Sequence, residues 1–142
     1  MQLLQTELAG AYRDLMDVKA QDRPGDPRVA QYGRAALQHY EAYLAGAGGE
    51  QRLVARAKAS PEDSDQRREA EGDLLSCLMA RFHCSRIALR LASEEPDRRA
   101  EWHTRAAREA EEILKVYREL PLPRFEQEAA MVLEMQQVLA GA

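Results

Sequence analysis

The side chains with the most distinctive chemistry lie close together in one stretch, where Cys77 is followed by His83 and Cys84. Thiolates and imidazoles are ligands that zinc prefers, and a structural zinc ion normally takes four of them. Adjacent residues in a helix point about 100° apart, so His83 and Cys84 cannot share a face. No face of such a helix offers more than two ligands. We therefore expect no metal site here.

The same cysteines are interpreted as buried free thiols. Seven residues along a helix place Cys77 and Cys84 about 10 Å apart, whereas a disulfide needs Cα atoms within about 7 Å. The chain also lacks the Glu-x-x-His and His-Glu-x-x-His spacings of helical metal enzymes, a glycine-rich phosphate loop and the setting of an activated nucleophile. The prediction is a protein that is not an enzyme and holds no cofactor.

Composition narrows the classes of partner. The 142 residues carry a net charge of -4, with 31% charged and 45% hydrophobic side chains. Nucleic-acid-binding domains usually leave a basic footprint, so we expect no nucleic acid as partner. No run of about 18 apolar residues is present, and the N-terminus lacks the layout of a signal peptide. We expect a cytoplasmic protein without membrane insertion.

The elements that position these side chains are predicted to be helices, because apolar residues recur at steps of three and four. The prediction is one all-α domain over residues 1–142. Its five helices are expected at residues 3–20, 28–45, 73–93, 98–119 and 124–140, with Asp97 capping the fourth. Residues 47–72 are predicted to form a mobile loop, because Ser60 to Glu69 contain no apolar side chain. A short helical turn from Arg52 to Ala59 is compatible with this loop.

Small and aromatic residues follow a pattern typical of tetratricopeptide repeats, in which antiparallel helix pairs stack side by side. The pattern consists of Leu8-Ala9 with Tyr12, then Ala36 with Tyr40 and Tyr43, then Met79-Ala80, then Ala110 with Leu114, Tyr117 and Pro121. It predicts that Ala36, Tyr40 and Tyr43 belong to the core and that the last helix is a cap. A plain antiparallel bundle explains the same stripes and remains an alternative.

Three strings carry a more specific signal: ELAGAYRDLMDVK at 7–19, ALQHYEAYL at 36–44 and MARFHCSRI at 79–87. In this order, and with a long insertion between the second and third, they resemble the C-terminal region of the kinesin-binding protein family. The turn EPDRR at 95–99, the string at 110–117 and a closing glutamate-rich helix with Met135 add to the resemblance. Members of that family are longer, and Gly10 and Cys84 depart from its usual residues.

The resemblance implies a function. Kinesin-binding proteins hold the motor domains of selected kinesins on a concave helical surface and keep them off microtubules. This chain is then expected to be a non-enzymatic, cytoskeleton-associated adaptor that supplies the C-terminal end of such a surface and regulates microtubule-based transport. The alternatives are a generic tetratricopeptide-like peptide-binding scaffold and a small self-associating helical bundle.

The residues that meet a partner follow from the repeat register, in which the first helix of each pair lines the groove. That register assigns Thr6, Gly10, Arg13 and Asp17 to the groove from the first helix, and Cys77, Arg81, Cys84 and Ser85 from the third. The predicted partner-binding residues are Arg13, Asp17, Arg81, Ser85 and Arg86. The two arginines of the third helix can also be solvated surface charges. Because one side of the first helix is left uncovered, self-association of the chain is a further expectation.

Overall fold

A computed structural model of the chain describes residues 2–141, with side chains from residue 4 onward. Every regular element in this range is helical, so the all-α prediction is confirmed. The six α-helices are α1 (Gln2–Asp22), α2 (Pro27–Gly46), α3 (Glu50–Ala59), α4 (Asp65–Glu94), α5 (Arg99–Glu119) and α6 (Glu126–Ala140). Two short 3₁₀ turns, η1 (Pro96–Arg98) and η2 (Pro123–Phe125), precede α5 and α6.

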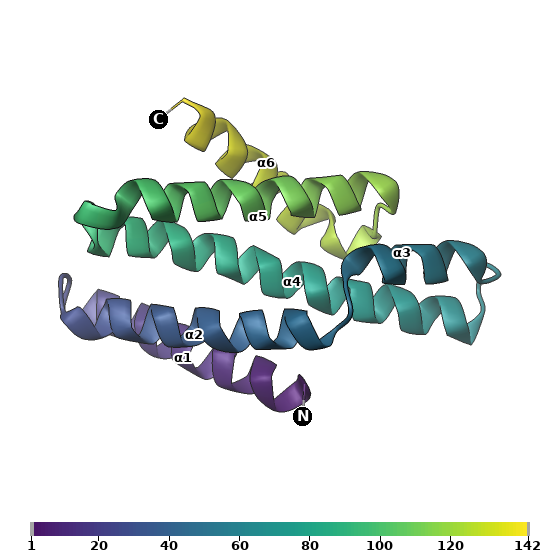
Figure 1. Cartoon of the computed structure of the whole chain (residues 1–142), viewed down its shortest axis with the longest axis horizontal. Helices are drawn as coiled ribbons and strands as arrows, with labels where there is room; N and C mark the ends of the chain where they lie inside the picture. Colours follow the sequence, from purple (N-terminus) through teal and green to yellow (C-terminus); the bar gives the residue numbers. More distant parts are fainter. Residues whose placement is uncertain (1, 142) are drawn as a thin grey trace.

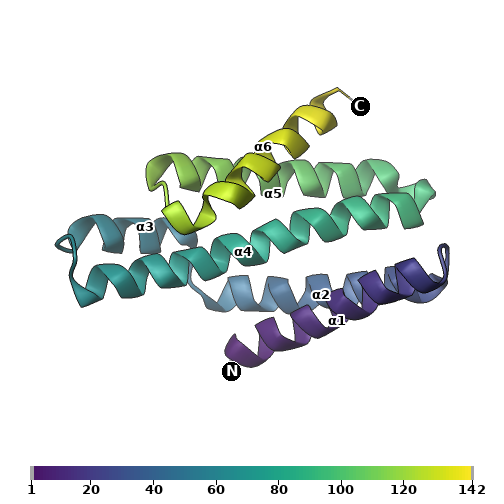
Figure 2. The same cartoon turned by 180° about the vertical axis from the view of Figure 1, so that it is seen from behind.

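The helices form two layers. In Figure 1 the layer nearer the viewer holds α2, α3 and α5, and in Figure 2, seen from behind, α1, α4 and α6 lie in front. Consecutive long helices run in opposite directions, as α1 with α2 and α4 with α5. The middle of the molecule is α4, which packs against α2, α3 and α5.

The core is densest along α4, whose side chains are buried on more than one side. Its largest fully buried residues are Leu74, Leu78, Ile87 and Leu91. A contact with α2 is tight at Gly33, where an added Cβ would lie 3.1 Å from both Leu91 and Met16. Only glycine therefore lets α1, α2 and α4 come this close without a shift of a neighbouring side chain.

The aromatic residues of α2 lie where the repeat pattern predicted. Ala36, Tyr40 and Tyr43 are all buried, with Ala36 completely inaccessible. The hydroxyl of Tyr40 accepts a hydrogen bond of 2.9 Å from the Arg13 guanidinium of α1. The prediction that this stretch belongs to the core is confirmed.

The predicted mobile loop at 47–72 is wrong. Residues 50–59 form α3, whose Leu53, Val54 and Ala57 are buried, and α4 already begins at Asp65. The Ser64 hydroxyl caps α4 by accepting from the backbone N–H of Arg67 at 3.2 Å. Within this range only residues 47–49 and 60–64 lie outside the helices. A polar run can continue a helix when a single buried position, here Ala70, and its caps hold it in place.

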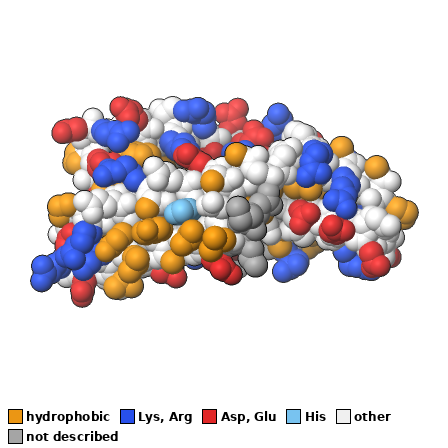
Figure 3. Space-filling view, turned by 60° about the horizontal axis from the view of Figure 1, so that its bottom comes forward, with side chains coloured by type: hydrophobic (Ala, Val, Ile, Leu, Met, Phe, Trp, Pro, Cys, Tyr) orange, Lys and Arg blue, Asp and Glu red, His pale blue; other side chains and the backbone are white. Residues whose placement is uncertain are grey.

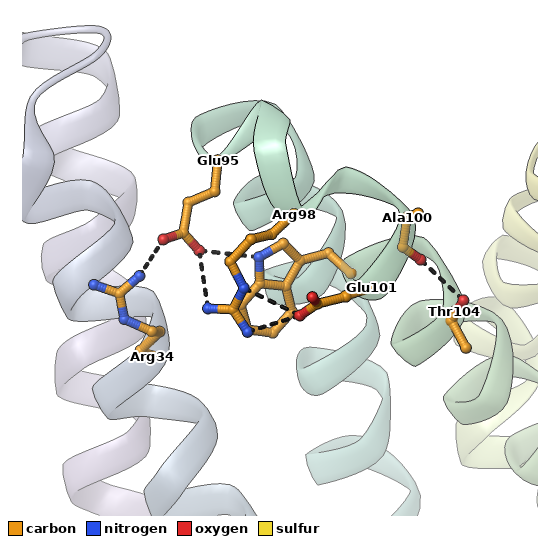
Figure 4. A network of polar contacts seen from close by, with 7 residues as sticks. Arg34, Glu95, Arg98, Ala100, Glu101 and Thr104 are labelled. Atoms are coloured by element: carbon orange, nitrogen blue, oxygen red, sulfur yellow. Dashed lines mark hydrogen bonds and ion pairs between the residues drawn. The ribbon is translucent and has the colours of Figure 1, made fainter.

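The turn between α4 and α5 differs from the prediction in detail. Asp97 lies inside η1 and caps no helix, because α5 begins at Arg99. The carboxylate of Glu95 organises this turn instead, accepting a hydrogen bond of 2.9 Å from the indole N–H of Trp102 and pairing with Arg34 of α2 (Figure 4). Arg98 lies over the Trp102 ring, 4.9 Å from its centroid. These contacts join α2 to the α4–α5 pair.

Candidate protein-binding surface

A groove runs between α1 and α4, two helices that lie in front in Figure 2. At its centre, Arg13 of α1 donates to Tyr40, and the ring of His83 stacks on Tyr40 with centroids 5.7 Å apart. These side chains separate a polar half of the groove from an apolar half. Arg13 and His83 both contact Tyr40, and the three side chains form the floor of the groove.

The polar half has a volume of about 290 Å³ and presents charges of both signs. Its lining residues are Arg13, Asp14, Met16, Asp17, His83, Arg86, Ile87 and Arg90. Burial, with the nearby Arg13 and Arg86, lowers the pKa of His83 to about 4. The imidazole is therefore neutral near pH 7, and the positive charge of this half comes from arginines alone.

The apolar half is wider, at about 500 Å³. Leu75 and Met79 of α4 line it opposite Thr6 and Gly10 of α1. Gly10 has no side chain, and an added Cβ there would have no neighbouring atom within 4 Å, so this part of the groove is open. Flexible methionines suit surfaces that adapt to a partner.

A second groove, of about 460 Å³, lies on the other flank of α4, against α6. Its apolar lining comes from Phe82, Leu89, Met131, Met135 and Val138. Polar side chains on its rim are Arg86, Arg90, Ser93 and Glu134. This groove is more apolar than the polar half of the first one.

Arg86 and Arg90 line both grooves, so they form a ridge between them, which we call the Arg86–Arg90 ridge. They are one helical turn apart and both exposed. Neither makes an ion pair with any described carboxylate, although the Arg86 guanidinium lies 5.7 Å from the Phe82 ring centroid. Two unpaired guanidiniums can bind carboxylates of a partner with two parallel hydrogen bonds each.

The predicted partner-binding residues divide into two groups. Arg13, Asp17 and Arg86 line the groove, and their role in binding stays a prediction. Ser85 is completely buried, and its hydroxyl donates to the Phe82 carbonyl at 2.7 Å, so its predicted place on the surface is wrong. Arg81 lies on the opposite flank of α4, where it binds two carboxylates.

The register of α4 explains this division. The face with Cys77, Arg81, Cys84 and Ser85 packs against α3 and α5, because α3 fills the space expected for a loop. The groove is lined instead by Leu75, Met79, His83, Arg86 and Arg90. These positions follow one another at steps of four, four, three and four, which is the spacing of one face of a helix. Extending that spacing in both directions from Arg86 identifies the other lining residues from the sequence.

Arg81 is part of a buried ion cluster. Its guanidinium lies 3.1 Å from the Glu50 carboxylate at the start of α3 and 2.9 Å from that of Glu109 on α5. Both glutamates are nearly inaccessible, and burial raises the pKa of Glu109 in spite of the neighbouring arginines. Arg81 Nε and Glu109 Oε2 have no partner. The cluster fastens α3 and α5 to α4 and is not accessible to a large partner.

The two cysteines are buried and free, as predicted. Burial raises the pKa of Cys77 to about 11 and that of Cys84 to about 12, so both are neutral thiols near pH 7 and poor nucleophiles. Within residues 2–141 no group of three or more His, Cys, Asp or Glu side chains is placed to hold a metal ion.

No family model, no curated protein and no solved structure matches this chain at a significant level. None of the helices in the described part of the chain combines the length and apolarity that crossing a bilayer requires.

Proposed function

We propose that this protein is a non-enzymatic adaptor that binds a folded protein domain on the face formed by α1, α4 and α6. The observation that carries this proposal is the Arg86–Arg90 ridge, which lies unpaired between two grooves of about 290 Å³ and 460 Å³. Arginine is enriched at protein interfaces and often contributes much of their binding energy. A ridge with a groove on either side suits a partner with a broad surface.

The arrangement of the helices supports a tetratricopeptide-like architecture for this face. The pairs α1–α2 and α4–α5 stack side by side with α6 after them, and the first helices of the pairs share one layer. In helix-pair solenoids such a layer lines the binding surface. The helix α3 and the long first turns of α4 account for the wide spacing between the two pairs.

The proposed partner is a kinesin motor domain, and its identity rests on the resemblance of three strings in α1, α2 and α4 to the kinesin-binding protein family. On this proposal the adaptor holds the motor domain and keeps it off microtubules. The charge of the ridge implies that the contacted surface of the motor domain carries carboxylates.

A second function is favoured by the apolar lining of the groove between α4 and α6. Met131, Met135 and Val138 can receive the apolar side of a peptide helix, as in other helix-in-groove complexes. The protein then acts as a peptide-binding scaffold, and a motor domain is not its partner.

Co-sedimentation with microtubules tests the proposal. Kinesin motor domains are mixed with microtubules in the presence and absence of the protein. We expect the protein to bind the motor domain and to move it from the pellet to the supernatant. If neither this chain nor a longer form containing it binds any motor domain, the kinesin proposal is wrong. Binding of an acidic amphipathic peptide in that case supports the scaffold.

A further inference from the structure

One flank of α1 exposes an apolar stripe that belongs to neither groove. Its residues are Leu4, Leu8, Ala11, Leu15 and Val18, which follow one another at steps of four, three, four and three. Leu4, Leu15 and Val18 are 53%, 47% and 60% exposed. This spacing is the a/d seam of a coiled coil, which normally faces another helix. Figure 3 shows hydrophobic side chains gathered along α1 on this side of the molecule.

The stripe is distinct from the rest of α1. Ala9 and Met16 point into the core, while Gly10, Arg13 and Asp17 face α4 across the groove. The stripe lies on the remaining flank, and of the residues that line the groove only Asp14 also borders a helix bound there. The surface proposed for an adaptor partner and this stripe can therefore be occupied together.

The stripe is also held rigid at its border with α2. Tyr12 stacks on His39 with ring centroids 5.7 Å apart and lies 6.3 Å from Tyr32. A ring nitrogen of His39 hydrogen-bonds to the Gln5 side chain at 2.7 Å. Since α1 is already folded and fixed on α2, a second helix can bind the stripe without the entropy cost of ordering it.

We infer that the stripe binds a second copy of this chain, with the two α1 helices parallel. In the heptad defined by the stripe, Glu7 and Asp14 occupy g positions and Lys19 an e position. A parallel pair places Asp14 of each copy beside Lys19 of the other, twice by symmetry, because g residues face e residues five positions on. An antiparallel pair instead places Glu7 beside Asp14 twice. Charge complementarity selects the parallel dimer.

Analytical ultracentrifugation across a range of concentrations tests the association. The full chain is expected to sediment as a dimer that dissociates on dilution. L15E places a charge in the middle of the seam and is expected to produce a monomer with an unchanged circular dichroism spectrum. L133E, at a residue of α6 that is 48% exposed, is the matched control and leaves the dimer intact.

Single cysteines test the orientation. V18C is expected to form a disulfide-linked dimer under mild oxidation, because residue 18 meets its own copy only in a parallel pair. D14K and K19D are each expected to weaken dimerisation about tenfold, and the double variant D14K/K19D to restore it, since exposed charge pairs of this kind have modest energies.

Three results would overturn the inference. One is a chain that stays monomeric at every concentration. Another is cross-linking of L4C with L15C in a mixture while V18C alone does not react, which is the antiparallel arrangement. The last is a concentration-dependent polymer abolished by L133E, which means that α6 of one copy binds α1 of the next.

Discussion

The guanidinium of Arg81, midway along α4, donates a hydrogen bond of 2.9 Å to the carboxylate of Glu109 on α5. The same guanidinium also pairs with Glu50, so R81A removes the ion-pair partner of two buried carboxylates. We expect a loss of about 3 kcal/mol in the free energy of unfolding, measured by urea denaturation.

R56A is the matched control, because Arg56 of α3 pairs with the exposed Glu69 of α4 at 3.4 Å, outside the Arg81 cluster. Its expected cost is about 1 kcal/mol or less. Equal losses of unfolding free energy in the two variants would contradict the inference that the Arg81 cluster holds α3 and α5 on α4.

Substitutions in the Arg86–Arg90 ridge test whether this surface binds the partner. R86E/R90E reverses two charges at the border of the grooves, and we expect the affinity for the partner to fall at least about tenfold while the unfolding curve stays the same. R108E, on the exposed side of α5 and outside both grooves, is the control. Titration calorimetry or interferometry with a motor domain measures the difference. An equal loss with R108E would point to non-specific electrostatic attraction.

The stability of the protein is expected to depend on the protonation of His83. Burial lowers the pKa of His83 in the folded state to about 4, from an ordinary value of 6.5. Between these values the unfolded chain binds more protons than the folded one, so the free energy of unfolding decreases as the pH falls from 6.5 to 4. Above pH 6.5 His83 contributes no pH dependence.

Urea denaturation at a series of pH values measures this effect. Because the ring is half-buried, we expect H83Q to remove about 1–2 kcal/mol of the decrease between pH 6.5 and 4. H103Q keeps His83 and controls for the substitution itself. If the free energy of unfolding depends on pH in the same way in the wild type and in H83Q, the pKa of His83 does not differ between the folded and unfolded states and the prediction is wrong.

Two glycines in helix interiors are expected to respond in opposite ways to leucine. At Gly10 a Cβ meets nothing within 4 Å, so G10L gains helix propensity, about 0.5–1 kcal/mol, and fills part of the groove. At Gly33 the new side chain collides with Leu91 and Met16, so G33L loses about 1–3 kcal/mol. Thermal unfolding of the two variants measures the contrast, and stabilisation by G33L would mean that α2 and α4 are not packed as described.

The long helices could be predicted because their apolar residues repeat with the period of a helix. The core positions Ala36, Tyr40 and Tyr43 followed from the same pattern. The helices at 47–72 were missed because few contacts stabilise them and these join residues far apart in the sequence. Leu53 and Val54 are buried in α3, which packs against α4, and Arg56 pairs with Glu69 at 3.4 Å across the turn. Local composition does not record such contacts.

The site was only partly predictable for a related reason. Assigning faces to α4 requires knowing which helices surround it, and α3 was not foreseen as one of them. Arg81 and Ser85 therefore received places on the groove, although α3 and α5 cover that flank. Arg90 and His83 were missed because the groove depends on the offset of α1 against α4, which no single stretch of the sequence encodes.

The central position of α4 has a consequence for how the molecule opens. At 30 residues α4 is about 45 Å long, and α2, α3 and α5 all pack directly on it. A solenoid with independent repeats frays from its ends, because each unit contacts only its neighbours. Here α2, α3 and α5 all pack on α4, so none of them can detach without exposing buried side chains of α4. The backbone amides of α2, α4 and α5 should then exchange with deuterium at a common rate, in a single cooperative opening.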